Sequence, residues 1–471
     1  MGRLNIMRPE SIGRGRYRSE GAPIVLTMGP LVVSANNSRY LAKPDGTIQF
    51  LAGLHTWSNF QDWGTADPPP TFDFTGYLSY LTARGMNYCR LWAAWEFSNW
   101  YNSSNPSWSG HGYFGQGCPY KRTGAGNAND GKLKYDLSQF EQTWFDRLRA
   151  RVIACRDAGV YCQILLFNPY PVANSPNTTD GGFPMQSGNN INSVAITLSD
   201  YWTLNNSTVT NLQDAFIQKV VDTVNDLPNV LYEVANEPGT GSLAWQTHVV
   251  TKVKTYQATK TYQHPVVMTG YSVIDSDLLA SNADVISPAS NTFESDGTKV
   301  TINDSDHSYY YVNILSDGAA IARGFPWWCL CRGTQPAFMD PWFVNWSGRN
   351  SPGGTITNGQ GTALDTTWDF MRNAITDVIT YAARIDLKQC TPQTSLSTTG
   401  YCIANPGHQY LAFQPGTGAF NVTLTAATYT YEWFDVVTRA ITGSGSFTAS
   451  SGARSFTPPN SDAHVLLLQG P

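Results

Sequence analysis

Residues 231–238, Leu-Tyr-Glu-Val-Ala-Asn-Glu-Pro, place two carboxylates in one short apolar segment. If this segment is a strand, alternation of its side chains puts Glu233 and Glu237 on the same face at different depths. A carboxyl at the end of a buried strand, shielded by aromatic side chains, has the raised pKa that a general acid needs near neutrality. Glu237 is therefore the candidate acid. The deeper Glu233 needs a cation, for which Arg90 is the candidate.

The elements around this segment alternate between strand and helix. Amphipathic spacing predicts helices at 74–84, 136–158, 208–227, 243–259 and 366–384, the second with Ser138 and Glu141 in capping-box spacing. Apolar segments predict strands at 49–54, 86–95, 160–167, 230–235, 265–269, 284–287, 299–303 and 335–339. Eight such strands predict an α/β fold, a (β/α)8 TIM barrel, in which chemistry lies on the loops after the strands. A doubly wound sheet is the alternative.

Two loops of the expected barrel are unusually long, residues 97–135 and 168–207. Both follow adjacent strands and are rich in aromatic residues, so we expect them to wall a cleft. A flexible insertion is the alternative.

After residue 390 the pattern changes to short alternating segments at 409–413, 420–425, 430–434 and 463–468, separated by turn signals. They predict a small C-terminal antiparallel β-sandwich. The expected division is an N-terminal arm at 1–31, a catalytic barrel at 32–388, a linker at 389–402 and the sandwich at 403–471.

Composition excludes several classes of protein. With 14% charged residues, a net charge of −5 and no basic block, the chain is not expected to bind nucleic acid. No apolar segment is long enough to span a membrane, and residues 1–20 lack the apolar core of a signal peptide. We nevertheless expect an extracellular or cell-surface location. The sequence indicates no oligomeric state.

The eight cysteines include no CxxC pair for zinc. Cys89, Cys155 and Cys162 lie in apolar segments and are expected to be core residues. Cys390 and Cys402 flank the linker, and the sequence leaves open whether they form a disulfide.

At 234–238, Val-Ala-Asn-Glu-Pro, the chain resembles the fourth-strand motif of the clan A glycoside hydrolases, the barrel superfamily that includes family 5. The resemblance implies that Glu237 is the acid/base, that Asn236 binds the sugar 2-hydroxyl and that Arg90 supports the nucleophile. A helix start with Pro238 in its first turn is the alternative for this motif. More narrowly, the Asn-Glu-Pro segment and segments 54–62, 304–307, 338–341 and 431–435 resemble bacterial glycoside hydrolases related to the apiosidases, which carry a C-terminal sandwich named for collagen binding.

The second carboxylate departs from the clan's pattern. The clan places a Glu after the seventh strand, where this chain has Asp304, with Asp306 as the second choice. An aspartate is one methylene shorter. A retaining enzyme needs carboxyl groups about 5–5.5 Å apart and an inverting one about 6.5–9.5 Å, so the stereochemical outcome stays open. Asp304 could instead cap the following helix.

Other residues expected at the barrel mouth supply aromatic faces and fixed polar groups for sugars. These substrate-binding candidates are His55, Trp57, Trp92, Trp95, Glu96, Asp306, His307 and Asp340. No HxH or HExxH spacing suggests a metal site, and no GxSxG suggests a serine nucleophile. No cofactor is expected.

The sequence thus predicts a glycoside hydrolase that cleaves O-glycosidic bonds of a poly- or oligosaccharide, with Glu237 as acid/base and Asp304 as nucleophile or base. The alternative is a non-catalytic carbohydrate-binding or structural surface or virion protein on a degenerate barrel. Asp in place of Glu favours this alternative, and the intact Asn236–Glu237 pair opposes it.

Overall fold

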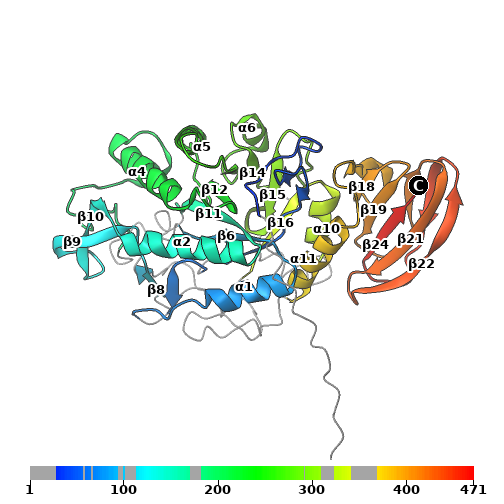
Figure 1. Ribbon diagram of the computed structural model, residues 1–471, viewed down its shortest axis with the longest axis horizontal. Coiled ribbons are helices and arrows are strands. Elements are labelled where there is room, and N and C mark those ends of the chain that lie inside the picture. Colours follow the sequence, from blue (N-terminus) through cyan, green and yellow to red (C-terminus); the bar gives the residue numbers. More distant parts are fainter. Residues whose placement is uncertain are drawn as a thin grey trace, which may run out of the picture.

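The computed structural model describes residues 28–56, 59–64, 67–93, 99–100, 113–169, 182–290, 292–308, 323–340 and 369–471. Figure 1 shows a barrel surrounded by helices, with antiparallel sheets from the C-terminal part of the chain at one end of the molecule. None of the helices in these ranges combines the length and the apolar character needed to cross a membrane.

Eight parallel strands close the barrel, which confirms the predicted (β/α)8 fold and makes the doubly wound alternative wrong. Each strand pairs with the next along the chain, and the eighth pairs with the first. In chain order they are β4 (Gly53–His55), β6 (Tyr88–Leu91), β11 (Tyr161–Phe167), β12 (Val230–Ala235), β13 (Val266–Thr269), β14 (Val285–Ser287), β15 (Val300–Asp304) and β16 (Gln335–Met339).

The helices of the described chain are α1 (Phe74–Ala83), α2 (Gln142–Asp157), α4 (Ser207–Val224), α5 (Leu243–Gln257), α6 (Asp275–Ala280), α7 (Ser305–Ser308), α10 (Gly324–Cys331) and α11 (Asp369–Ala382). Their caps follow from the sequence. Asp73 accepts from the backbone N–H of Gly76 at the start of α1, and Asn206 accepts from Thr208 and Val209 at the start of α4.

The predicted start of the second helix is wrong. Residues 133–140 form strand β10 (Leu133–Phe140), which pairs with β9 (Tyr120–Asn127), and α2 begins only at Gln142. Ser138 does not cap it: its N–H and hydroxyl donate to Asp136, whereas Glu141 accepts from the N–H of Thr143. Pairing across the hairpin supplies the backbone hydrogen bonds that a longer helix would otherwise supply.

Both long loops carry secondary structure. Residues 97–135 contribute β7 (Asn99–Trp100), β8 (Tyr113–Gln116) and the β9–β10 hairpin, and β8 pairs with β5 (Asp62–Gly64) and β7. The loop after β11 contains the 3-10 helix η1 (Leu198–Trp202). The flexible-insertion alternative does not hold for these described parts.

A small apolar core fills the N-terminal end of the barrel. Strands β1 (Val32–Val33), β2 (Leu41–Ala42) and β3 (Ile48–Gln49) form a three-stranded sheet that was not predicted. Leu31 and Leu41 pack there with apolar residues of the barrel strands, among them Tyr88, Leu231 and Val300. Apolar packing at this end favours the carboxyl ends of the strands as the place for a polar site.

The C-terminal region is antiparallel, as predicted. Its six-stranded sheet has the order β17 (Thr391–Pro392), β18 (Cys402–Asn405), β19 (Gln409–Gln414), β24 (His464–Gln469), β21 (Ala427–Asp435) and β22 (Ala440–Ala449). A two-stranded sheet of β20 (Phe420–Leu424) and β23 (Gly452–Phe456) encloses a second apolar core with it. The expected linker at 389–402 holds β17 and the 3-10 helix η3 (Thr394–Leu396). The domain boundaries themselves stay a prediction.

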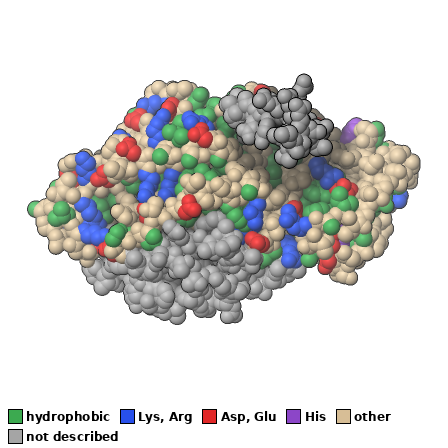
Figure 2. All heavy atoms as spheres, turned by 60° about the horizontal axis from the view of Figure 1, so that its bottom comes forward, with side chains coloured by type: hydrophobic (Ala, Val, Ile, Leu, Met, Phe, Trp, Pro, Cys, Tyr) green, Lys and Arg blue, Asp and Glu red, His purple; other side chains and the backbone are tan. Residues whose placement is uncertain are grey.

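All eight cysteines are free thiols in the structure, so Cys390 and Cys402 do not form a disulfide in it. On the face shown in Figure 2, the described Lys and Arg side chains lie among Asp and Glu side chains.

Candidate active site

Arg90 organises the polar interior of the barrel. It projects from β6 and is 1% exposed. Its Nε and Nη2 donate to the two carboxylate oxygens of Glu233 at 2.7 and 2.6 Å, the ion pair that the sequence suggested. Gln163 Nε2 and Thr269 Oγ1 also donate to Glu233, at 2.9 and 3.1 Å. Glu233 is therefore saturated with donors, and its role is to fix the guanidinium plane.

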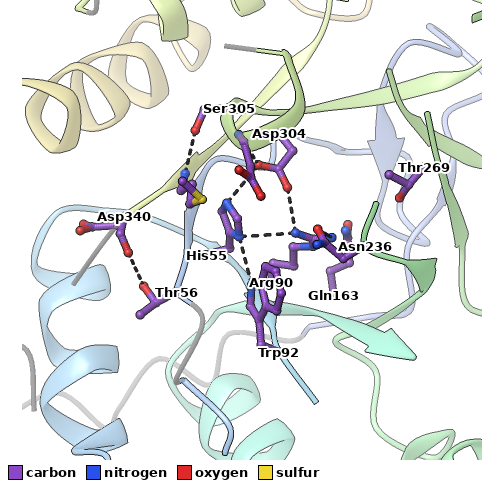
Figure 3. A network of polar contacts seen from close by, with 12 residues as sticks. His55, Thr56, Arg90, Trp92, Gln163, Asn236, Thr269, Asp304, Ser305 and Asp340 are labelled. Atoms are coloured by element: carbon purple, nitrogen blue, oxygen red, sulfur yellow. Dashed lines mark hydrogen bonds and ion pairs between the residues drawn. The ribbon is translucent and has the colours of Figure 1, made fainter. Parts of the chain in front are cut away.

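The remaining donors of Arg90 reach toward the mouth of the barrel (Figure 3). Nη1 donates to Oδ2 of Asp304 at 3.0 Å, and Nη2 donates to Oδ1 of Asn236 at 3.1 Å. Asp304 is the last residue of β15, the seventh barrel strand, and Asn236 directly follows β12, the fourth. One guanidinium thus links the two strand ends to which the sequence assigned the chemistry.

Asp304 also has the local role that the helix-capping alternative proposed. Its Oδ1 accepts from the backbone N–H of Asp306 at 2.9 Å, and α7 begins at the next residue, Ser305. The capping contact uses Oδ1, while Oδ2 faces Arg90, so the two roles coexist in one side chain. The donors on both oxygens stabilise its ionised form.

His55, at the end of β4, lies between Asp304 and Trp92. Its Nδ1 accepts from the indole Nε1–H of Trp92 at 3.0 Å and lies 3.5 Å from Nη1 of Arg90. Two donors facing Nδ1 leave no room for a proton there, so the neutral ring carries its proton on Nε2. Nε2 lies 3.0 Å from Oδ1 of Asp304, a close contact that is not aligned as a hydrogen bond. In Figure 3, dashed lines join His55 and Arg90 to Asp304, and Trp92 to His55.

Glu237 lies two residues beyond the end of β12 with a strained backbone. Its φ is +45°, in the left-handed region that side chains other than glycine seldom adopt. Burial raises the pKa of Glu237 to about 7; Arg90 opposes this shift and Asp304 adds to it. The next helix, α5, begins only at Leu243, so the alternative of a helix start at Pro238 is wrong.

Trp202 covers the chain just after this glutamate. It belongs to η1 and is 7% exposed. A Cβ added to Gly239 would lie 2.4 Å from Cζ2 of Trp202, so the indole ring lies directly against the Gly239 backbone. The ring can make this contact because the residue has no side chain.

Asp306 is buried close to both candidate carboxylates. Burial raises the pKa of Asp306 well above its usual range, and the charges of Glu237 and Asp304 raise it further, against the effect of Arg90. These effects disfavour the ionised form of the Asp306 carboxyl group, which favours Asp304 over Asp306 as the ionised second carboxylate.

The remaining predicted site residues fall into three groups. Trp92 is 1% exposed and stacks on His55 at a ring angle of 13°, so it supports the histidine from inside the core. Asp340 accepts two hydrogen bonds from Arg372, at 2.7 and 2.9 Å, and both side chains are buried. Because both carboxylate oxygens face Arg372, these contacts do not support a role for Asp340 in sugar binding. Trp57, Trp95, Glu96 and the side chain of His307 lie outside the described residues.

Several site residues were not predicted from the sequence. Gln163 and Thr269 lie inside the barrel on β11 and β13, and Asn59 holds the backbone of β6 through hydrogen bonds with the Arg90 carbonyl and the Trp92 N–H. Inward alternation along β11 could have indicated Gln163. Asn59 carries no such signal because it lies outside any strand.

Comparison with known proteins supports the fold. No family model matches the chain, and no curated protein matches its sequence. Among solved structures, a protein named a glycoside hydrolase aligns with a TM-score of 0.62 at 13% identity, covering 95% of this chain and 98% of that one. A glycoside hydrolase family 5 protein from Bacteroides vulgatus aligns with a TM-score of 0.62 at 12% identity, covering 94% of both chains. The chain has the fold of these glycoside hydrolases along almost its whole length.

Proposed function

We propose that this protein hydrolyses O-glycosidic bonds, with Glu237 as the acid/base and Asp304 as the second carboxylate. One observation carries the proposal: a carboxyl group whose pKa is raised to about 7 follows the fourth strand, and a carboxylate bound to Arg90 ends the seventh. Two carboxyl groups held in opposite protonation states at one barrel mouth are what glycoside hydrolysis requires.

The chemistry follows from these states. Protonated Glu237 donates its proton to the glycosidic oxygen as the bond to the anomeric carbon breaks. Asp304 then supplies electrons, either by bonding to the anomeric carbon or by removing a proton from an attacking water. In the first case ionised Glu237 activates the water that releases the sugar and regains its proton. In this proposal Asn236, whose Oδ1 accepts from Arg90, binds the sugar 2-hydroxyl, as the resemblance implies.

The decisive experiment compares wild type with Glu237→Gln, Asp304→Asn and Asp306→Asn on a panel of polysaccharides and plant glycosides. We expect the first two variants to lose at least about 1,000-fold in kcat on unactivated substrates. Asp306→Asn distinguishes the two candidates for the second carboxylate: burial and the charges of Glu237 and Asp304 raise the pKa of Asp306 and disfavour its ionised form, so this variant should keep most of the activity. Activity retained by Glu237→Gln would contradict the proposal. Proton NMR of the first product then distinguishes retention from inversion.

The resemblance to the apiosidase-related hydrolases determines part of the substrate panel. We propose that the substrate is among those of the apiosidase-related hydrolases, on the support of the five matching segments alone. Glycosides with branched pentoses such as apiose therefore belong on the panel.

A second candidate function is carbohydrate binding without cleavage. It is favoured by the contacts of Asp304, whose oxygens are occupied by Arg90, the Asp306 N–H and His55, and by its shorter side chain. Oligosaccharide that binds wild type and is recovered intact after prolonged incubation would support this function over hydrolysis.

A further inference from the structure

Three cysteine thiols meet in the layer between the barrel and α2. Cys89 is on β6, Cys162 is its direct partner in register on β11, and Cys155 is on α2. Their sulfur atoms all lie within 4.8 Å of one another, and those of Cys89 and Cys155 are 3.7 Å apart. All three residues are 0% exposed.

The spacing of the sulfurs fits a metal ion without rearrangement. One side of the sulfur triangle is 3.7 Å and the other two are at most 4.8 Å, so an ion equidistant from the three sulfurs lies about 2.0 to 2.6 Å from each. That range contains the zinc–thiolate bond length of about 2.3 Å. Sequence motifs do not show this set, because its members come from three separate elements.

The surrounding charge favours an anionic centre. Arg151 lies one helical turn before Cys155 on α2, is 7% exposed, and forms no ion pair within the described residues. Its guanidinium donates to the carbonyl of Asn59 and lies over the ring of Phe74. Asp62, the one carboxylate that acts on it electrostatically in the described chain, is already paired with Arg147 at 2.6 Å.

A buried charge without a partner is costly, so a neighbouring anion would stabilise Arg151. Three thiolates and a divalent ion carry a net charge of −1, which Arg151 balances. Three neutral core thiols would leave the guanidinium unbalanced. This difference favours a metal centre over ordinary packing of cysteines in a core.

We propose that Cys89, Cys155 and Cys162 bind one divalent thiophilic cation of the zinc class, with Arg151 balancing the charge. The ion joins β6, β11 and α2 from the outer side of the barrel. Cys89 directly precedes Arg90, so the same strand would be held from outside by the metal and from inside by Glu233. Because the thiols are fully buried, the ion enters during folding.

To test the proposal, the full chain is refolded with Zn²⁺ or Cd²⁺, weakly bound metal is removed with a chelator, and the metal content is measured by mass spectrometry. We expect one ion per chain, a cadmium–thiolate absorption band in the ultraviolet, and a raised Tm. Cys162→Ser should lose the ion and the band. Cys329→Ser, which removes a buried free thiol on α10, is the matched control and should keep both.

Cys155→Ala provides a second route if Cys162→Ser does not fold, because alanine is favourable in a helix. Arg151→Met should keep the thiols but weaken metal retention by about tenfold or more. Folded wild type that retains no more ion than Cys162→Ser or Cys155→Ala would overturn the proposal, as would equal loss of metal in Cys329→Ser.

Discussion

At the scale of single residues, the site depends on keeping neighbouring acids in different protonation states. Burial raises the pKa of both Glu237 and Asp306, whereas hydrogen-bond donors to both carboxylate oxygens of Asp304 favour its ionised form. Arg90 contacts Asp304 and Glu233 directly, so it sets the electrostatics of the whole group.

Glu237 should lower stability at alkaline pH. Its pKa of about 7 in the folded state exceeds the usual 4.5, so its contribution is most favourable below pH 4.5 and is lost as pH rises through 7. Glu237→Gln should therefore be more stable than wild type at pH 8, by about 3 kcal/mol at most, and not at pH 4. Urea unfolding at the two pH values measures the difference; an equal effect at both would contradict it. Wild-type activity should fall as pH rises above about 7.

Trp92 should act on the reaction through His55. Trp92→Phe removes the indole donor to Nδ1 and leaves only Arg90 Nη1, 3.5 Å away, on that side of the ring, so His55 is held less firmly beside Asp304. We expect kcat to fall by up to about 100-fold with KM little changed. Phe167→Leu, a buried aromatic change in β11 without a polar contact to the site, is the control for lost packing alone. A drop of the same size in that control would argue for a structural effect only.

At the scale of elements, the strand ends were predictable and the insertions were not. Buried segments such as 230–235 and 335–339 match β12 and β16 residue for residue, because a barrel strand is buried on both faces and is therefore mostly apolar. The β9–β10 hairpin was missed because Leu137 and Phe140 also fit helical spacing, and only pairing across the hairpin decides between the two. The same contrast applies to the site. The residues that the sequence predicted lie at or near the ends of barrel strands, namely Arg90, Asn236, Glu237 and Asp304. The role of Trp92 could not be predicted, because it depends on a contact with His55 on another strand.

The junction of α5 with β13 should lose stability in acid. Burial lowers the pKa of His264 to about 4, while its Nε2 lies 2.9 Å from the Asn225 carbonyl. A histidine with a depressed pKa contributes stability above its usual 6.5 that is lost as pH falls toward 4. Wild type should lose up to about 3 kcal/mol in this range, and His264→Gln less. Denaturant unfolding of both proteins at pH 7 and pH 4.5 tests this. If wild type and His264→Gln lose the same free energy of unfolding between the two pH values, His264 is not the cause.

At the scale of the whole molecule, the C-terminal sheet and the barrel share one apolar core. Trp327 of α10 contacts Phe413 and Phe434 of the sheet, and Tyr381 of α11 contacts Phe434 with ring centroids 5.0 Å apart. Glu432 joins the same junction through Arg384 and the Tyr381 hydroxyl, each at 2.6 Å. The change of composition after residue 390 indicated a second unit, but no sequence signal showed that its aromatic residues pack on the barrel.

This junction should make the two parts unfold together. Phe434→Ala removes the ring between Trp327 and Tyr381, and we expect a loss of about 3–5 kcal/mol. Calorimetry of wild type should show one transition, and of the variant one transition at lower temperature. Phe447→Ala, on the far sheet edge away from the barrel, is the comparison. Two separate transitions in wild type would contradict a shared core.

The contact between Trp202 and Gly239 has a consequence for how this sequence can change. Alanine at position 239 needs space that the indole ring occupies, and a smaller residue at 202 frees that space. Substitutions at these two positions, 37 residues apart in the chain, should therefore be tolerated as a pair where the single change at 239 is not. Relatives with a side chain after the Asn-Glu-Pro segment should accordingly lack the tryptophan.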